Sequence, residues 1–89
     1  MWRPEGVETV AARDLFIARA EVLAVSDLPL RGPVTRPEAD AAIQATIRMR
    51  GGVRGCVAAL AYEFGEHPET AAERMRRARA AVTSAYDAA

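Results

Sequence analysis

Residues 53–76 read VRGCVAALAYEFGEHPETAAERMR, and this stretch decides the fold. From Val53 onward, apolar residues recur at i, i+3, i+4, i+7, i+8 and i+11, which is the spacing of one face of an α-helix. Gly65 is expected to end this helix, because glycine accepts the left-handed backbone found at helix ends. Glu66-His67-Pro68 is expected to form a turn into the next helix, since proline suits the first helical position. The apolar face consists of Val53, Cys56, Val57, Leu60, Ala61 and Phe64.

Helices are also predicted on both sides of this segment. A C-terminal helix covers about residues 68–86, where apolar residues again share one face. Another helix covers residues 35–50, because Thr35 and Glu38 have the spacing of a capping box and two glycines follow Arg50. The C-terminal face consists of Ala71, Met75, Ala78, Val82 and Ala85 or Tyr86, and the other of Ala39, Ala42, Ile43, Thr46 and Ile47.

An N-terminal helix is predicted over residues 7–25, where apolar residues cover more than one face, as in a helix buried on two sides. Within it, residues 21–26 are also compatible with a short strand. Residues 26–34 contain two prolines and one glycine and are predicted to be a linker. These segments together predict an all-α fold, with about four helices in a single small domain over residues 1–89.

The composition limits this domain to a modest core. Twenty of the 89 residues are alanine, which buries little apolar area, so a partner subunit is one way to complete the core. A single cysteine excludes an internal disulfide, which makes the cytoplasm the expected compartment. No apolar run approaches the roughly 20 residues of a membrane span, and the first residues lack a signal-peptide layout. We therefore expect no membrane association.

Charge is distributed unevenly along the chain. Twelve arginines balance twelve acidic residues, and lysine is absent, so the formal net charge is zero. Residues 48–79 nevertheless contain seven arginines and four glutamates, a net charge of +3, whereas residues 1–47 have a net charge of −2. Arginine suits phosphate and guanine contacts because its planar group donates two hydrogen bonds. The zero total therefore does not exclude a nucleic-acid partner.

Residues 57–76 resemble the helix-turn-helix motif of bacterial DNA-binding domains. In that motif a small residue lets the two helices cross closely, and a glycine four residues later makes the turn; Ala61 and Gly65 occupy these positions. The Pro-Glu-Thr that opens the second helix is similar to that of many bacterial regulators and sigma-factor-like domains. The resemblance implies a tri-helical unit over residues 35–86, in which residues 35–50 form the supporting helix. The apolar positions of the motif match Leu60, Phe64, Ala71 and Met75.

The resemblance further implies a small transcriptional regulator that binds DNA, with homodimerisation expected through the N-terminal helix. The N-terminal part of the last helix would enter the major groove, and a symmetric dimer would double a small contact surface. The expected DNA contacts are Thr70, Glu73, Arg74, Arg76 and Arg77, with Arg50 and Arg54 on backbone phosphates.

An alternative interpretation is a helical protein–protein interaction module, or a subunit of a larger assembly, that does not bind DNA. The wide apolar surface of the N-terminal helix and the zero net charge favour this alternative. So do the acidic residues within the motif, Glu66, Glu69 and Glu73, because carboxylates near phosphates repel them. Trp2 would either pack the N-terminus onto the core or anchor a partner.

Catalytic and metal-binding chemistry is not indicated by the sequence. Cys56 lies on the apolar face and is expected to be a small buried residue. His67 is the only histidine, and it follows the far end of the same helix, where it is unsuited to activate that thiol or to bind a metal alone. We therefore expect no enzyme activity, no cofactor and no bound metal ion.

Overall fold

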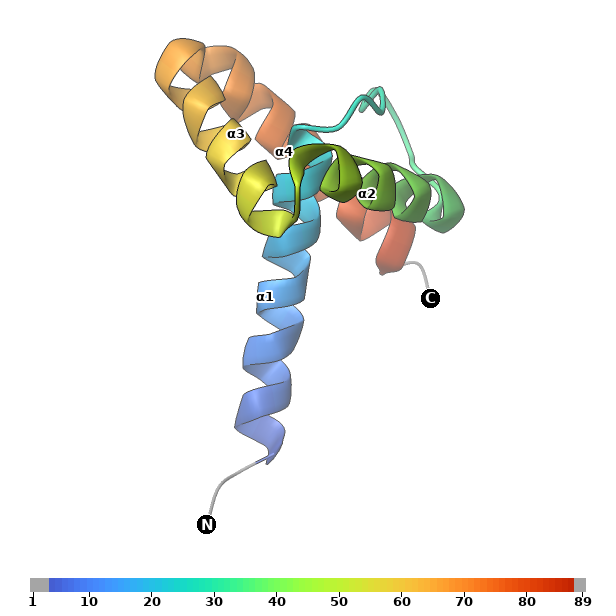
Figure 1. The fold of residues 1–89 in the computed structure, drawn as a ribbon. Helices are drawn as coiled ribbons and strands as arrows, with labels where there is room; N and C mark the ends of the chain where they lie inside the picture. Colours follow the sequence, from blue (N-terminus) through green and yellow to red (C-terminus); the bar gives the residue numbers. More distant parts are fainter. Residues whose placement is uncertain (1–3, 88–89) are drawn as a thin grey trace.

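A computed structural model describes residues 4–87 of the protein, and the described side chains begin at residue 14. This part of the chain forms four α-helices and no strand, which confirms the predicted all-α architecture (Figure 1). None of these helices is long and apolar enough to cross a membrane. Trp2 lies outside the described residues. The helices are α1 (Pro4–Ala24), α2 (Arg36–Arg50), α3 (Val53–Glu66) and α4 (Pro68–Tyr86).

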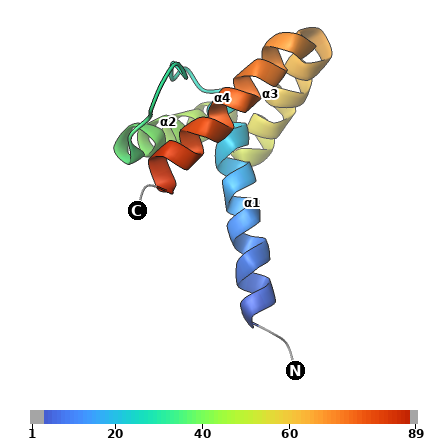
Figure 2. The ribbon, with the colours of Figure 1, turned by 180° about the vertical axis from the view of Figure 1, so that it is seen from behind.

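The two halves of α1 have different surroundings. Its C-terminal half packs against α2, α3 and α4, whereas its N-terminal half extends away from the other helices (Figures 1 and 2). This extension gives the molecule principal extents of 45 × 27 × 25 Å. α1 stays helical to Ala24 and closes with a turn, in which the Ser26 N–H donates to the Leu23 carbonyl at 3.1 Å. Residues 21–26 therefore form a helix end and not a strand.

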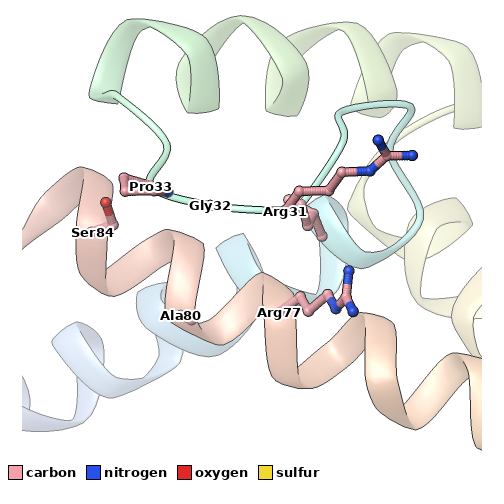
Figure 3. Close-up of a pocket in the computed structure, with 7 residues that line it drawn as sticks. Arg31, Gly32, Pro33, Arg77, Ala80 and Ser84 are labelled. Atoms are coloured by element: carbon pink, nitrogen blue, oxygen red, sulfur yellow. The ribbon is translucent and has the colours of Figure 1, made fainter.

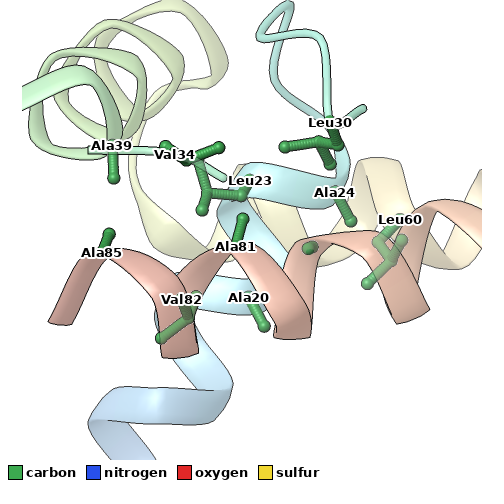
Figure 4. Packing of buried hydrophobic residues seen from close by; sticks show 11 residues of the cluster. Ala20, Leu23, Ala24, Leu30, Val34, Ala39, Leu60, Ala81, Val82 and Ala85 are labelled. Carbon is green, nitrogen blue, oxygen red and sulfur yellow. The ribbon is translucent and has the colours of Figure 1, made fainter. Parts of the chain in front are cut away.

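Small side chains fill the core where α1 packs against α4 (Figure 4). Alanine has no side chain beyond Cβ, so two helices that meet through alanines approach each other closely. Leu23 of α1 and Val82 of α4 supply the larger buried side chains, and Leu30 and Val34 cover the cluster from the linker. The many alanines of the sequence thus serve helix–helix contact. Those in the cluster are Ala20, Ala24, Ala39, Ala78, Ala81 and Ala85.

α2 begins and ends as its sequence predicts. The Glu38 N–H donates to the Thr35 Oγ1 at 3.3 Å, and the Thr35 N–H donates to the Glu38 Oε1 at 3.0 Å, which together form the capping box. At the other end, Gly51 and Gly52 have φ angles of 77° and 114°, in the region that favours glycine. Local sequence signals therefore fix both boundaries of this helix.

The junction between α3 and α4 differs from the predicted glycine turn. Gly65 lies within α3, which continues to Glu66, and His67 is the single residue between the two helices. The backbone of His67 is not helical, with φ −139° and ψ 67°, because the following proline disfavours helical geometry at the residue before it. Pro68, not Gly65, therefore ends α3. The two helices then run back side by side (Figures 1 and 2).

The buried face of α3 is narrower than the six apolar residues predicted for it. Only Cys56 and Leu60 are buried, while Val53, Val57 and Phe64 are about two-fifths exposed and Ala61 is also exposed. α3 lies at one side of the molecule, so a stripe of two residues, four apart, is enough to pack it. Ala61 therefore does not occupy the tight helix crossing that its match to the motif implies.

Candidate functional site

Arg74, expected from the sequence to contact DNA, is engaged inside the protein. Its guanidinium donates to the carbonyl oxygens of Leu23 at 3.2 Å, Ala24 at 3.2 Å, Ser26 at 3.0 Å and Leu28 at 3.4 Å. Partial burial lowers the pKa of this guanidinium, and the neighbouring positive charge of Arg77 lowers it further. Arg74 therefore joins α4 to the end of α1 and to the linker.

Two further predicted contacts, Arg76 and Arg77, share one carboxylate. The Arg77 Nε donates to the Glu73 Oε2 at 2.8 Å, and Arg76 pairs with the other carboxylate oxygen. These two hydrogen bonds, with that of Arg77 contributing most, lower the pKa of Glu73 below its usual value. On this face of α4, the predicted DNA contact Glu73 thus offsets part of the positive charge that phosphate would attract.

The remaining predicted contacts are separated by the length of α3. Arg50 and Arg54 are exposed at the α2–α3 corner, and Thr70 is exposed in the first turn of α4, beyond the other end of α3. A helix of 14 residues spans about 21 Å at 1.5 Å per residue. The structure therefore brings Thr70, Glu73, Arg74 and Arg77 together along one shallow pocket of α4 and leaves Arg50 and Arg54 beyond the other end of α3, so the seven predicted contacts do not form one compact patch.

The surface where α1 leaves the body is apolar. Leu15 and Ile17 are 49% and 43% exposed. Beside them, a cavity of about 410 Å³ opens between α1 and α4. Its lining is mostly apolar, with one arginine at its edge. The lining residues are Phe16, Ile17, Ala20, Met75 and Arg79. We call Leu15, Ile17 and this cavity the α1 surface.

Tyr86 joins the C-terminal end of α4 to the rest of the molecule. The guanidinium of Arg19 stacks on its ring at 3.8 Å from the centroid, Arg36 lies at 5.3 Å, and the hydroxyl donates to Asp40. Burial, and then the Asp40 carboxylate, raise the pKa of Tyr86 to about 12. The sequence gives no sign of this cluster, because its members lie on three different helices.

Cys56 is fully buried, as predicted, and its Sγ lies 3.9 Å from the Thr46 carbonyl oxygen. Burial raises the pKa of this thiol, so it stays protonated and is a poor nucleophile. Among the side chains that the structure describes, no group of three or more potential ligands is arranged to hold a metal ion. The features available for function are therefore the α1 surface and the arginines.

Comparison with known proteins gives no assignment. No protein-family model, no curated protein and no solved structure matches the chain.

Proposed function

We propose that this protein is a helical protein–protein interaction module that pairs with a second copy of itself through α1. The observation that carries this proposal is the projection of the N-terminal half of α1 from the helical body (Figure 2). Leu15 and Ile17 are exposed at the base of this projection, next to an apolar cavity. An isolated helix shorter than about 12–15 residues is marginal in water, so a projecting helix gains stability when a partner covers it.

Charge is compatible with a second copy as that partner. Each half of α1 contains both signs of charge, with Glu5, Glu8 and Arg13 in the first half and Asp14, Arg19 and Glu21 in the second. A two-fold interface brings the same segment of both copies together, so a segment with both signs of charge suits it. The zero net charge of the chain adds no overall repulsion between copies.

Sedimentation of the full chain tests this proposal. We expect a mass of two chains at micromolar concentration, and a mass of one chain for Ile17→Glu, because a carboxylate at the interface would be desolvated. Val57→Glu is a matched control, since Val57 is 41% exposed and lies on α3, away from the projecting half of α1. A wild-type chain that stays single, or a pair broken only by Val57→Glu, would refute the proposal.

DNA binding is a second candidate function, with one observation in its favour. Arg48, Arg50 and Arg54 are all exposed around the Gly51-Gly52 corner, where guanidinium groups could meet backbone phosphates. Fluorescence anisotropy with duplex DNA should then show affinity that falls steeply with salt, and that is lost when these three arginines are replaced by alanine. Absence of binding at low salt would exclude this function, and binding unchanged in the triple variant would exclude this corner as its site.

A further inference from the structure

We propose that the cleft between the linker and α4 binds the phosphate group of a small molecule. This cleft has a volume of about 500 Å³ and is separate from the α1 surface. Arg31 of the linker and Arg77 of α4 line it from opposite sides (Figure 3). Two guanidinium groups on one cleft match the double negative charge of a phosphate group.

The linker side of the cleft is held in place at both ends. At its C-terminal end, the Val34 N–H donates to the Ser84 Oγ and the Ser84 hydroxyl donates back to the Val34 carbonyl, both at 3.3 Å. At its N-terminal end, Arg74 binds the carbonyl oxygens of Ser26 and Leu28. Leu30 is 4% exposed and anchors the middle. The cleft is therefore formed before a ligand arrives, which reduces the ordering cost of binding.

Arg77 is oriented by its neighbours in a way that suits an anion. Its Nε donates to Glu73, and this bond leaves both terminal nitrogens of the guanidinium for a ligand. Glu73 offsets part of the positive charge of Arg77, so the cleft depends on Arg31 for the rest of the positive charge that a phosphate group needs.

The other residues that line the cleft indicate the chemistry of the rest of the ligand. Leu30, Pro33 and Ala80 present apolar atoms, and Gly32 exposes backbone with open space above its Cα. The hydroxyl of Ser84 is already used by Val34 and does not select a ligand. A phosphate monoester with a small apolar group therefore fits the chemistry of the cleft better than an anion with several phosphate groups.

An NMR titration of the full ¹⁵N-labelled chain with inorganic phosphate tests the site, with acetate and chloride at matched ionic strength as comparisons. We expect saturable shifts at the amides of Gly32 and Ala80, with phosphate binding more tightly than acetate. Arg31→Gln and Arg77→Gln should each weaken binding about fivefold or more, as expected for one lost charge-assisted contact. Arg36→Gln, at an exposed arginine of α2 that does not line the cleft, should leave the affinity unchanged.

Three outcomes would overturn the proposal. Phosphate shifts that grow linearly, as with chloride, would mean screening and not binding. Equal or tighter binding of acetate would exclude selection of a phosphate dianion. Wild-type affinity in Arg31→Gln, with a dispersed spectrum that confirms folding, would show that the linker arginine takes no part.

Discussion

The Nη2 atom of Arg74 in α4 lies 3.0 Å from the backbone carbonyl oxygen of Ser26, a residue 48 positions earlier in the chain. The same guanidinium also binds the carbonyls of Leu23 and Ala24, which belong to the last turn of α1. Carbonyls at a helix end lack partners within the helix and carry partial negative charge, so a cation there is favourable. One side chain on α4 therefore completes the end of α1 and fixes the start of the linker.

Replacing Arg74 with alanine should lower the free energy of unfolding by about 2 kcal/mol, because several charge-assisted hydrogen bonds are lost and partly buried carbonyls remain unpaired. Urea denaturation monitored by circular dichroism measures this change. Arg76→Ala is the control, since the side chain of Arg76 is 68% exposed and pairs only across the surface of α4. Equal losses in the two variants would contradict a structural role for Arg74.

Two glycines of α3 should respond to alanine in opposite directions. A Cβ on Gly55 would lie 1.8 Å from the carbonyl oxygen of Arg50, so Gly55→Ala forces α2 and α3 apart. The free energy of unfolding should fall by about 3 kcal/mol, as it does in overpacked cores. A Cβ on Gly65 meets no atom within 4 Å, and Gly65 is helical, so Gly65→Ala should stabilise the protein by about 0.5 kcal/mol.

The Gly65→Ala variant also decides between the two descriptions of the α3–α4 junction. If Gly65 formed a left-handed turn, as its match to the helix-turn-helix motif implies, alanine would be strained there and the protein would lose about 1 kcal/mol. Thermal unfolding of the two glycine variants beside the wild type gives the sign of each change. Destabilisation by Gly65→Ala would contradict the one-residue junction at His67.

The features predicted correctly from the sequence are those fixed by residues close together in the chain. The capping box of Thr35 and Glu38 and the left-handed Gly51 depend on a few neighbouring positions, and the structure contains both. At the α3–α4 junction, Gly65 and Pro68 each predict the end of a helix. The structure follows Pro68, which keeps His67 out of helical geometry, while Gly65 remains within α3.

The roles of the arginines could not be read from the sequence, because they depend on distant partners. The four carbonyls bound by Arg74 lie 46 to 51 positions away, and sequence spacing gives no hint of them. The pairing of Glu73 with Arg76 and Arg77, by contrast, follows helical spacing of three and four residues. The sequence therefore locates the basic helix but does not identify Arg74 as the arginine that turns inward.

Acid should weaken the start of α2. The hydrogen bonds from the Thr35 backbone and side chain lower the pKa of Glu38, so its folded-state value lies below that of the unfolded chain. The stability from this carboxylate is present above the unfolded pKa and is lost as the pH falls through the folded pKa. Thr35→Ala removes the side-chain hydrogen bond and keeps the larger backbone one, so it should raise the pKa of Glu38 only part of the way to its usual value, measured by NMR, and cost about 1 kcal/mol for the lost cap. A variant with unchanged stability and unchanged pKa would contradict the capping role of the Thr35 hydroxyl.

Alkali should loosen the contact between α4 and α1. The pKa of Tyr86 is raised to about 12, above the ordinary value of 10, so the folded state keeps its phenol protonated where the unfolded state would not. The associated stability is present below pH 10 and is lost as the pH rises from 10 toward 12. A Tyr62→Phe variant leaves Tyr86 as the only tyrosine, and its phenolate absorbance in the near ultraviolet reports the titration directly.

The midpoint of that titration should lie near 12, and Asp40→Asn in the same background should move it toward 10 without reaching it, because burial is the larger cause of the shift. Arg19→Gln removes the guanidinium that stacks on the ring at 3.8 Å, and since that charge lowers the pKa of Tyr86, its loss should move the midpoint upward. If Asp40→Asn lowers the midpoint and Arg19→Gln raises it, both Asp40 and Arg19 lie close enough to Tyr86 to set its pKa. A midpoint near 10 that neither variant moves would mean that Tyr86 is solvated and that α4 does not pack there.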